Sequence, residues 1–279
     1  MRVIKFILIF ILSLLLVGCL TPLPFGNPTS STSNPNSSTS PVSPSTSVTP
    51  PPASESSSQP PLETSDQGST ATPSGLPSQL EPKEVAQGTP GRNRIALTFD
   101  AGAGRGYIDQ ILETLVRNKV PATFFVTGAW AEDNPKDVKR ISQLGFRIGN
   151  HTQTHPYLTG LSDEEIRNEL HSLEQKVVEL TGRSTRPLFR PPYGDRDERV
   201  LEIAASEGYW SIYWTIDSLD WQEGHDPQWV KERILSRLED GAIILCHVAS
   251  PYTYLVLDEL IQSIREMGFT FVPIEEFLK

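Results

Sequence analysis

The stretch Ile95–Gly104, "IALTFDAGAG", places an apolar run directly before a single aspartate, Asp100. The run has the length and composition of a buried β-strand. The four residues after Asp100 have small side chains or none, so they allow either a tight turn or the close approach of another group to the carboxylate. What else the chain brings to this strand end therefore decides both the fold and the function.

Similar apolar β-type runs recur along the chain, and helical patterns separate most of them. The runs are "RIALTF", "ATFFVTG", "FRIGN", "PLFRP", "YWSIYWTI", "AIILCHV" and "FTFVPI". Helical periodicity is expected over residues 107–118, 163–180, 198–206, 226–238 and 254–267, and Ser162 with Glu165 three residues later predicts a capping box at the start of the second. About seven strands alternating with helices predict a parallel α/β fold, in the first place a closed or nearly closed barrel, with an open doubly wound sheet as the alternative. In both folds functional groups gather at the carboxyl ends of the strands.

The start of the chain is typical of an exported protein. Basic residues precede the apolar run 6–17, which is short for a membrane span and ends in the tetrad Leu16-Val17-Gly18-Cys19. We interpret residues 1–18 as a signal peptide, with a membrane anchor as the alternative. The tetrad resembles a bacterial lipobox, which implies cleavage before Cys19 and lipid attached to it. The mature protein would then be anchored to the cell membrane and face outside the cytoplasm.

Composition separates a tether from a folded domain. Residues 19–90 are rich in Ser, Thr and Pro and poor in aliphatic side chains, so we expect a disordered tether there. Residues 91–279 are long enough for one domain with a core of its own. The second of the two cysteines, Cys246, lies in an apolar run, which favours a core position over a disulfide or a nucleophile.

Charge and motifs argue against two classes of function. The formal net charge is −10 with a sequence pI of about 5.0, and no basic patch stands out, so nucleic acid is not an expected partner. No G-x-G-x-x-G or Walker pattern opens a helix, so nucleotide binding has no support.

Five strand ends deliver residues that can bind metal, move protons or hold charge. They are Asp100, the pair His151 and His155, Arg190, the pair Asp217 and Asp220, and His247. Each alone is compatible with a structural role, but together on one edge of the sheet they predict a functional cluster. The two histidines of the first pair are four residues apart, and on a turn of helix this spacing would place both imidazoles on one side, ready to share a metal ion. The structural alternative is that they cap the loop.

The blocks TFDxG, HTxxH, RPPYG, DSxDW and L-x-H occur in this order between residues 95 and 277. This set resembles the polysaccharide deacetylases of carbohydrate esterase family 4, which include peptidoglycan and chitin deacetylases and acetylxylan esterases. The resemblance implies a distorted (β/α) barrel, TIM-barrel-like, of about seven parallel strands. It also implies metal-assisted hydrolysis of N- or O-acetyl groups on a polysaccharide.

The resemblance assigns proton transfer to two residues and their support to two more. Asp100 would be the general base, held by a charge pair with Arg190. His247 would be the general acid, oriented by Asp220. These roles agree with elementary chemistry, because water needs a base and the leaving amine needs a proton near neutral pH.

Binding roles follow from the same blocks. His151 and His155 match the metal-binding histidines. Tyr193 would offer its backbone N–H to the oxyanion, while Trp221 would line the pocket and Leu245 would receive the acetyl methyl group. The implied cofactor is a divalent metal, with zinc as the first expectation and cobalt or nickel as alternatives.

The sequence departs from the family pattern at Ala101. The usual first block is TFDDG, and its second aspartate is the third protein ligand of the metal. Three interpretations follow: the ion is held weakly by two histidines and water, Glu132 or Asp133 supplies a substitute carboxylate, or the protein binds glycans without turnover. We expect an active enzyme because the acid and the base are both retained. Peptidoglycan is the expected polymer because of the tether, with chitooligosaccharides and acetylated xylan as alternatives.

Overall fold

The computed structural model describes residues 84–278. The expected signal peptide, Cys19 and nearly all of the expected tether lie outside the described residues. Within the described part of the chain, no helix is both long and apolar enough to cross a membrane.

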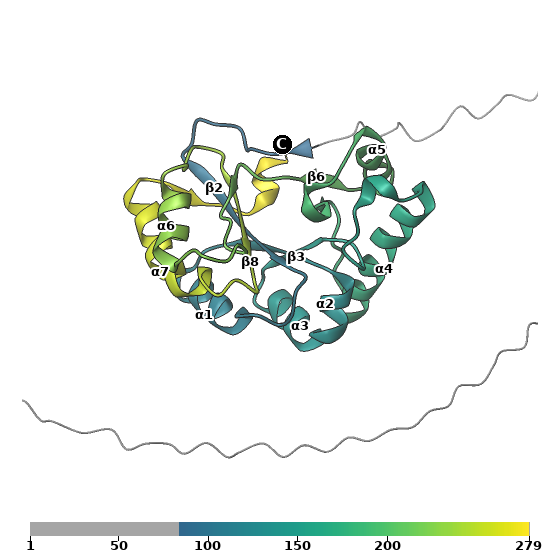
Figure 1. The fold of residues 1–279 in the computed structure, drawn as a ribbon, viewed down its shortest axis with the longest axis horizontal. Helices are drawn as coiled ribbons and strands as arrows, with labels where there is room; N and C mark the ends of the chain where they lie inside the picture. Colours follow the sequence, from purple (N-terminus) through teal and green to yellow (C-terminus); the bar gives the residue numbers. More distant parts are fainter. Residues whose placement is uncertain (1–83, 279) are drawn as a thin grey trace, which may run out of the picture. The chain divides into compact units, whose positions relative to one another are not determined.

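The fold is a curled, open barrel of parallel strands with helices around it, as Figure 1 shows. The nine strands follow the order β1-β6-β5-β4-β3-β2-β8-β7, with β9 paired to β2, and all the pairings are parallel. The strands are β1 (Glu84–Val85), β2 (Arg94–Ala101), β3 (Ala122–Val126), β4 (Arg147–Asn150), β5 (Leu188–Phe189), β6 (Trp210–Ile212), β7 (Ile216–Asp217), β8 (Ile243–His247) and β9 (Thr270–Phe271). The predicted α/β barrel class is confirmed.

The strand count differs from the expected seven at two places. The run "YWSIYWTI" is divided into β6 and β7. The backbone carbonyls of Ile212 and Tyr213, at the break, accept hydrogen bonds from the side chain of Arg190 instead of from a neighbouring strand. In addition, β1 lies before Gly91 and pairs with β6.

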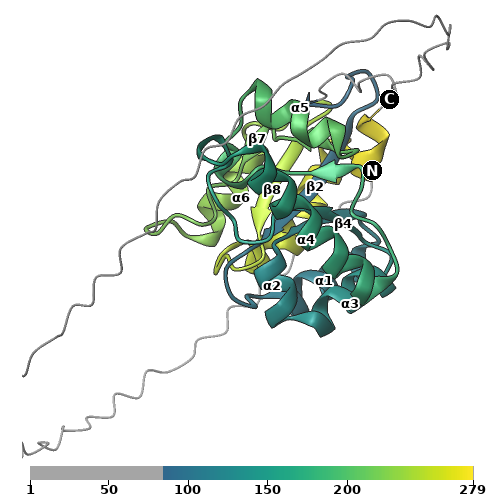
Figure 2. The same cartoon turned by 90° about the vertical axis from the view of Figure 1, so that its right-hand side faces the viewer.

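Helices form a belt around the sheet. They are α1 (Ile108–Asn118), α2 (Gly128–Asp133), α3 (Pro135–Gln143), α4 (Asp163–Thr181), α5 (Glu198–Ser206), α6 (Pro227–Leu235) and α7 (Thr253–Glu266). In Figure 1, α6 and α7 lie at the left of the sheet and α4 and α5 at the right, with α1, α2 and α3 along the lower edge between them; Figure 2 shows these three helices together at the lower end of the fold. The five helices expected from periodicity are present, and α4 begins with the predicted capping box of Ser162 and Glu165.

The alternation of side chains along β2 places Asp100 on the inner side of the barrel. Leu97, Phe99 and Ala101 point into the main core, between the sheet and its helices, where each is at most 1% exposed. Successive side chains of a strand face opposite sides, so Thr98 and Asp100 point to the inside of the barrel. Cys246 of the adjacent strand β8 is also buried in the main core, as predicted from the apolar sequence around it.

Candidate active site

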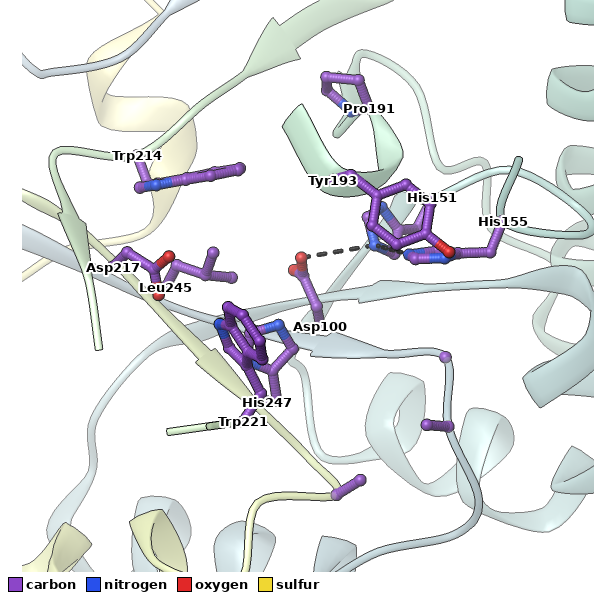
Figure 3. Close-up of a pocket in the computed structure, with 13 residues that line it drawn as sticks. Asp100, His151, His155, Pro191, Tyr193, Trp214, Asp217, Trp221, Leu245 and His247 are labelled. Atoms are coloured by element: carbon purple, nitrogen blue, oxygen red, sulfur yellow. Dashed lines mark hydrogen bonds and ion pairs between the residues drawn. The ribbon is translucent and has the colours of Figure 1, made fainter. Parts of the chain in front are cut away.

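A cavity of about 590 Å³ opens at the carboxyl ends of the strands. Figure 3 shows the side chains that converge on it. Seven of the predicted site residues line it: Asp100, His151, His155, Tyr193, Trp221, Leu245 and His247. Two more, Arg190 and Asp220, are fully buried behind this wall. The remaining lining residues are Gly102, Ala103, Pro191, Trp214, Asp217 and Ala249.

Asp100 is held by a buried arginine. Nη1 of Arg190 donates to Oδ1 of Asp100 at 2.7 Å and to the hydroxyl of Thr98 at 3.0 Å, and Nε donates to the carbonyl of Ile212. The guanidinium also lies 4.1 Å from the centre of the Phe125 ring. Burial, the largest single influence, would raise the pKa of Asp100, but the charge and hydrogen bond of Arg190 together with the nearby histidines His151 and His247 outweigh it and hold that pKa below its ordinary range. The carboxylate is therefore ionised at neutral pH.

The two histidines converge from a loop rather than from a helical turn, so that part of the prediction is wrong. β4 ends at Asn150, and the chain then adopts positive φ angles at Thr152 (68°) and His155 (64°). Asn150 stabilises this path by accepting the N–H of Thr152 at 2.9 Å, and the Thr152 hydroxyl accepts the N–H of His155. As a result, Nε2 of His151 and Nε2 of His155 lie 3.2 Å apart.

The protonation of this pair suits metal binding. Nδ1 of His151 lies 2.8 Å from the carbonyl oxygen of Arg190, which can only accept, so the proton sits on Nδ1 and the lone pair on Nε2 is free. Burial lowers the pKa of His151, and burial together with the charge of His151 lowers the pKa of His155 to about 4. Both imidazoles are therefore neutral at pH 7, which is the form that binds metal.

A third metal ligand is missing from the arrangement. Within residues 84–278, no group of three or more His, Cys, Asp or Glu side chains is placed to hold a metal ion. Glu132 does not line the cavity: its carboxylate accepts from Gln153 at 3.2 Å, and Asp133 is also absent from the lining. The residues thus fit an ion held by two imidazoles, one ligand fewer than the three that catalytic zinc usually has.

His247 stands on the opposite side of the cavity at the end of β8. Its Nδ1 lies 2.7 Å from Oδ1 of Asp220, and its backbone N–H donates to Oδ2 of the same carboxylate at 3.0 Å. The hydroxyl of Thr253 donates to Oδ2 as well. Burial lowers the pKa of His247, but the hydrogen bond and charge of Asp220, together with the charges of Asp100 and Asp217, outweigh this and raise it above the ordinary value. Asp220 therefore stabilises the imidazolium form, and Nε2 is left to face the cavity.

The walls around these groups are largely apolar. Leu245 is nearly buried, whereas Trp221 and Tyr193 are more than half exposed at the rim. Tyr193 is a non-glycine residue with φ of 58°, a strained conformation of the kind that gathers at functional sites. Sequence reasoning missed Trp214, because the apolar pattern around it indicated a continuous strand. Asp217 was noticed at a strand end but received no role.

A curled parallel barrel with an aspartate–arginine pair, a histidine pair and an aspartate–histidine pair at its strand ends places the protein among the distorted (β/α) barrels of the carbohydrate esterase type. The sequence profile of the polysaccharide deacetylase family matches residues 87–212. Peptidoglycan-N-acetylmuramic acid deacetylase PdaA of Bacillus subtilis is 34% identical over 186 residues, which cover 66% of this chain and 71% of PdaA. The chain belongs to the polysaccharide deacetylase family, carbohydrate esterase family 4, whose members are typically metal-dependent.

Solved structures and a second relative agree with this assignment. The structure of PdaA, a family 4 carbohydrate esterase, has a TM-score of 0.67 at 33% identity and covers 70% of this chain and 85% of that one. Peptidoglycan-N-acetylglucosamine deacetylase PgdA of Listeria monocytogenes is 35% identical over 72% of this chain but only 42% of its own length. BA3943 of Bacillus anthracis, described as a pseudoenzyme of the family, has a TM-score of 0.68 at 32% identity, with 72% and 70% of the chains covered. A mutant of BA3943 is described as having restored enzymatic activity.

Proposed function

We propose that the protein hydrolyses acetyl groups from an N-acetylated polysaccharide, with peptidoglycan as the polymer. The observation that carries this proposal is the presence of a candidate base and a candidate acid, each held by a buried partner, that face one cavity. Asp100 is ionised beside Arg190, and the pKa of His247 is raised beside Asp220. A protein that only binds glycans needs neither a base nor an acid. The names of PdaA and PgdA support the choice of polymer.

The two histidines are the proposed metal ligands. Their Nε2 atoms lie 3.2 Å apart and both imidazoles are neutral at pH 7, which suits zinc, with cobalt and nickel as alternatives. When bound, a divalent metal would supply Lewis-acid polarisation of the acetyl carbonyl and acidify water.

Asp100 would accept the proton of the attacking water. Arg190 holds the carboxylate still and keeps its pKa low, so Asp100 is a weak base that serves only a water that is already acidified. The backbone N–H of Tyr193 would donate to the developing oxyanion. Leu245 would contact the acetyl methyl group, and Trp221 would cover the sugar at the rim.

His247 would complete the reaction from the other side. As the bond between carbon and nitrogen breaks, Nε2 gives its proton to the leaving nitrogen, and acetate and a free amine result. Asp220 stabilises the charged imidazole before transfer and keeps Nδ1 protonated throughout.

A second candidate function is glycan binding without turnover. Two observations favour it: Ala101 replaces the usual third ligand, and the similar structure BA3943 is described as a pseudoenzyme. Acetate release from peptidoglycan, chitooligosaccharides and acetylated xylan, with zinc added, separates the candidates. Release from peptidoglycan supports the proposal, and release from xylan alone indicates an acetylxylan-type esterase. Binding without release from any polymer indicates the second candidate.

We also propose that the protein is exported and anchored to the membrane by lipid on Cys19. The lipobox-like tetrad that ends at Cys19 supports this. A Cys19→Ser variant is expected to appear in the soluble fraction with unchanged acetate release. Continued membrane association of the variant would indicate that residues 6–17 remain as an uncleaved anchor.

A further inference from the structure

Two tyrosine rings stand together at the rim of the cavity. Tyr157 and Tyr193 stack with ring centroids 4.3 Å apart and planes 17° apart, yet the residues are 63% and 58% exposed. The ring of Tyr193 also contacts the His155 ring edge-on, with centroids 4.4 Å apart, on the histidine side of the cavity in Figure 3. Tyr193 lines the cavity, whereas Tyr157 does not. The pair therefore extends the wall of the cavity outward onto the surface.

Hydrogen bonds fix this pair before any ligand arrives. The carboxylate of Asp195 accepts the backbone N–H of Thr159 at 2.8 Å and its hydroxyl at 3.0 Å, so it joins the loop of Tyr157 to the turn of Tyr193. Leu158, next to Tyr157, is fully buried and anchors the same loop. Two segments distant in sequence are thus pinned so that their aromatic rings remain together and exposed.

Such a surface suits one face of a sugar ring. The C–H groups of a pyranose carry slight positive charge, and the face of an aromatic ring carries slight negative charge, so the two attract when stacked. A rigid pair of rings loses little conformational entropy on binding. A polysaccharide continues beyond its acetylated unit, and the next unit has to leave the cavity across its rim.

We propose that Tyr157 and Tyr193, here called the tyrosine platform, bind a neighbouring sugar of the glycan strand whose acetylated unit occupies the cavity. Tyr157 is then a residue that determines chain-length preference, since it lies outside the cavity and cannot reach the reacting acetyl group. This inference rests on the proposed function for the identity of the polymer.

The test compares Tyr157→Ala with Tyr157→Phe, which keeps the ring and loses the hydroxyl. Met267→Ala is the control, because Met267 is also half exposed but follows the far end of α7. Each protein is sedimented with insoluble peptidoglycan, which measures binding without turnover. Each is also assayed on a chitin hexasaccharide and on 4-nitrophenyl acetate, which is too small to reach the rim.

In Tyr157→Ala, binding to peptidoglycan and the ratio of kcat/KM for the hexasaccharide to that for the small ester are both expected to fall by about 3- to 10-fold, mainly through KM. Tyr157→Phe and Met267→Ala are expected to match the wild type. An equal loss of kcat on both substrates would overturn the proposal, because it would mean that Tyr157 only supports the strained backbone of Tyr193. Unchanged binding in Tyr157→Ala would overturn it as well. Failure of the proposed function shows separately, as a wild type that sediments with peptidoglycan but releases no acetate.

Discussion

The two sides of the cavity are built to different degrees of completeness. On the side of His247, a fully buried carboxylate makes contacts with the ring, with the backbone of the same residue and with the hydroxyl of Thr253. On the side of His151 and His155, two nitrogen atoms converge, but within residues 84–278 no group of three or more His, Cys, Asp or Glu side chains is placed to hold a metal ion. The proton-transfer side is therefore fully supported, while the metal side is one ligand short.

This difference teaches that the acid His247 and the histidine pair are supported separately, whereas the base Asp100 touches both sides, with Oδ2 3.4 Å from Nε2 of His151. The hydrogen bond that raises the pKa of His247 does not involve the histidine pair. The hydrogen bonds that position His155 in its loop do not involve Asp220. Changes on one side should therefore alter proton transfer with little effect on metal binding, and changes on the other side should do the reverse. The variants below test this separation.

Removal of the proposed general acid should have the largest effect on turnover. His247→Ala leaves no proton donor for the leaving nitrogen, so kcat for acetate release is expected to fall by about 10²–10⁴-fold. Zinc content after dialysis should stay at the wild-type level, because His151 and His155 are untouched. Near-normal turnover in this variant would remove His247 from the mechanism, and lost zinc would show that the two sides are not separable.

Removal of the buried arginine should have the largest effect on stability. Arg190→Met leaves Asp100 without its ion pair in a buried site, which is expected to lower the free energy of unfolding by about 3–5 kcal/mol. Urea unfolding measures this change. Adding Asp100→Asn to the variant removes the uncompensated charge and should recover part of the loss. A double variant no more stable than Arg190→Met would show that packing of the guanidinium, rather than its pairing with Asp100, is what stabilises the fold.

The proton-transfer side was the more predictable from sequence, and the reason is physical. A residue that directly ends a strand inherits its position from the sheet, and parallel pairing in register places Asp100 beside His247. Asp220 lies in a loop, and its role came from the family resemblance rather than from a pattern. The capping box of α4 was equally visible, because it depends on residues three positions apart.

The metal side was less predictable because its geometry depends on loop conformation. The spacing of His151 and His155 suggested a helical turn, whereas the chain reaches the same convergence through left-handed residues and hydrogen bonds from Asn150 and Thr152. Trp214 was missed for a similar reason. The break between β6 and β7 comes from long-range bonds of Arg190, which no local apolar pattern reveals.

Restoring a carboxylate should have an intermediate effect and would sharpen the contrast between the two sides. In Ala101→Asp, zinc retention is expected to rise by roughly 10-fold or more, because a charged third ligand would join the histidine pair. Ala101 is 1% exposed and packs in the main core, so the melting temperature without metal should fall. Added zinc should then stabilise the variant more than the wild type. Unchanged zinc retention would mean that the side chain at position 101 stays in the core.

The smallest effect should come from removing the negative charge of Asp220, which stabilises the protonated form of His247. The pH dependence of kcat measures it. The pKa of His247 is raised above its ordinary value of 6.5, so the proton is present below that value and is lost as the pH rises through the raised pKa. Acetate release should therefore decline on the alkaline side.

Asp220→Asn keeps a hydrogen-bond acceptor for Nδ1 but removes the negative charge. Burial, which lowers the pKa of His247, is then opposed only by the charges of Asp100 and Asp217, so the alkaline decline should move to lower pH with little change in kcat in acid solution. The same linkage predicts that the wild type gains stability from this pair below pH 6.5 and loses it as the pH rises through the raised pKa, whereas the variant shows a weaker dependence. A kcat profile with the same alkaline limb in both proteins would mean that a group other than His247 controls it. Asp220 would then not be the group that keeps the acid protonated, and its contacts with His247 would be structural.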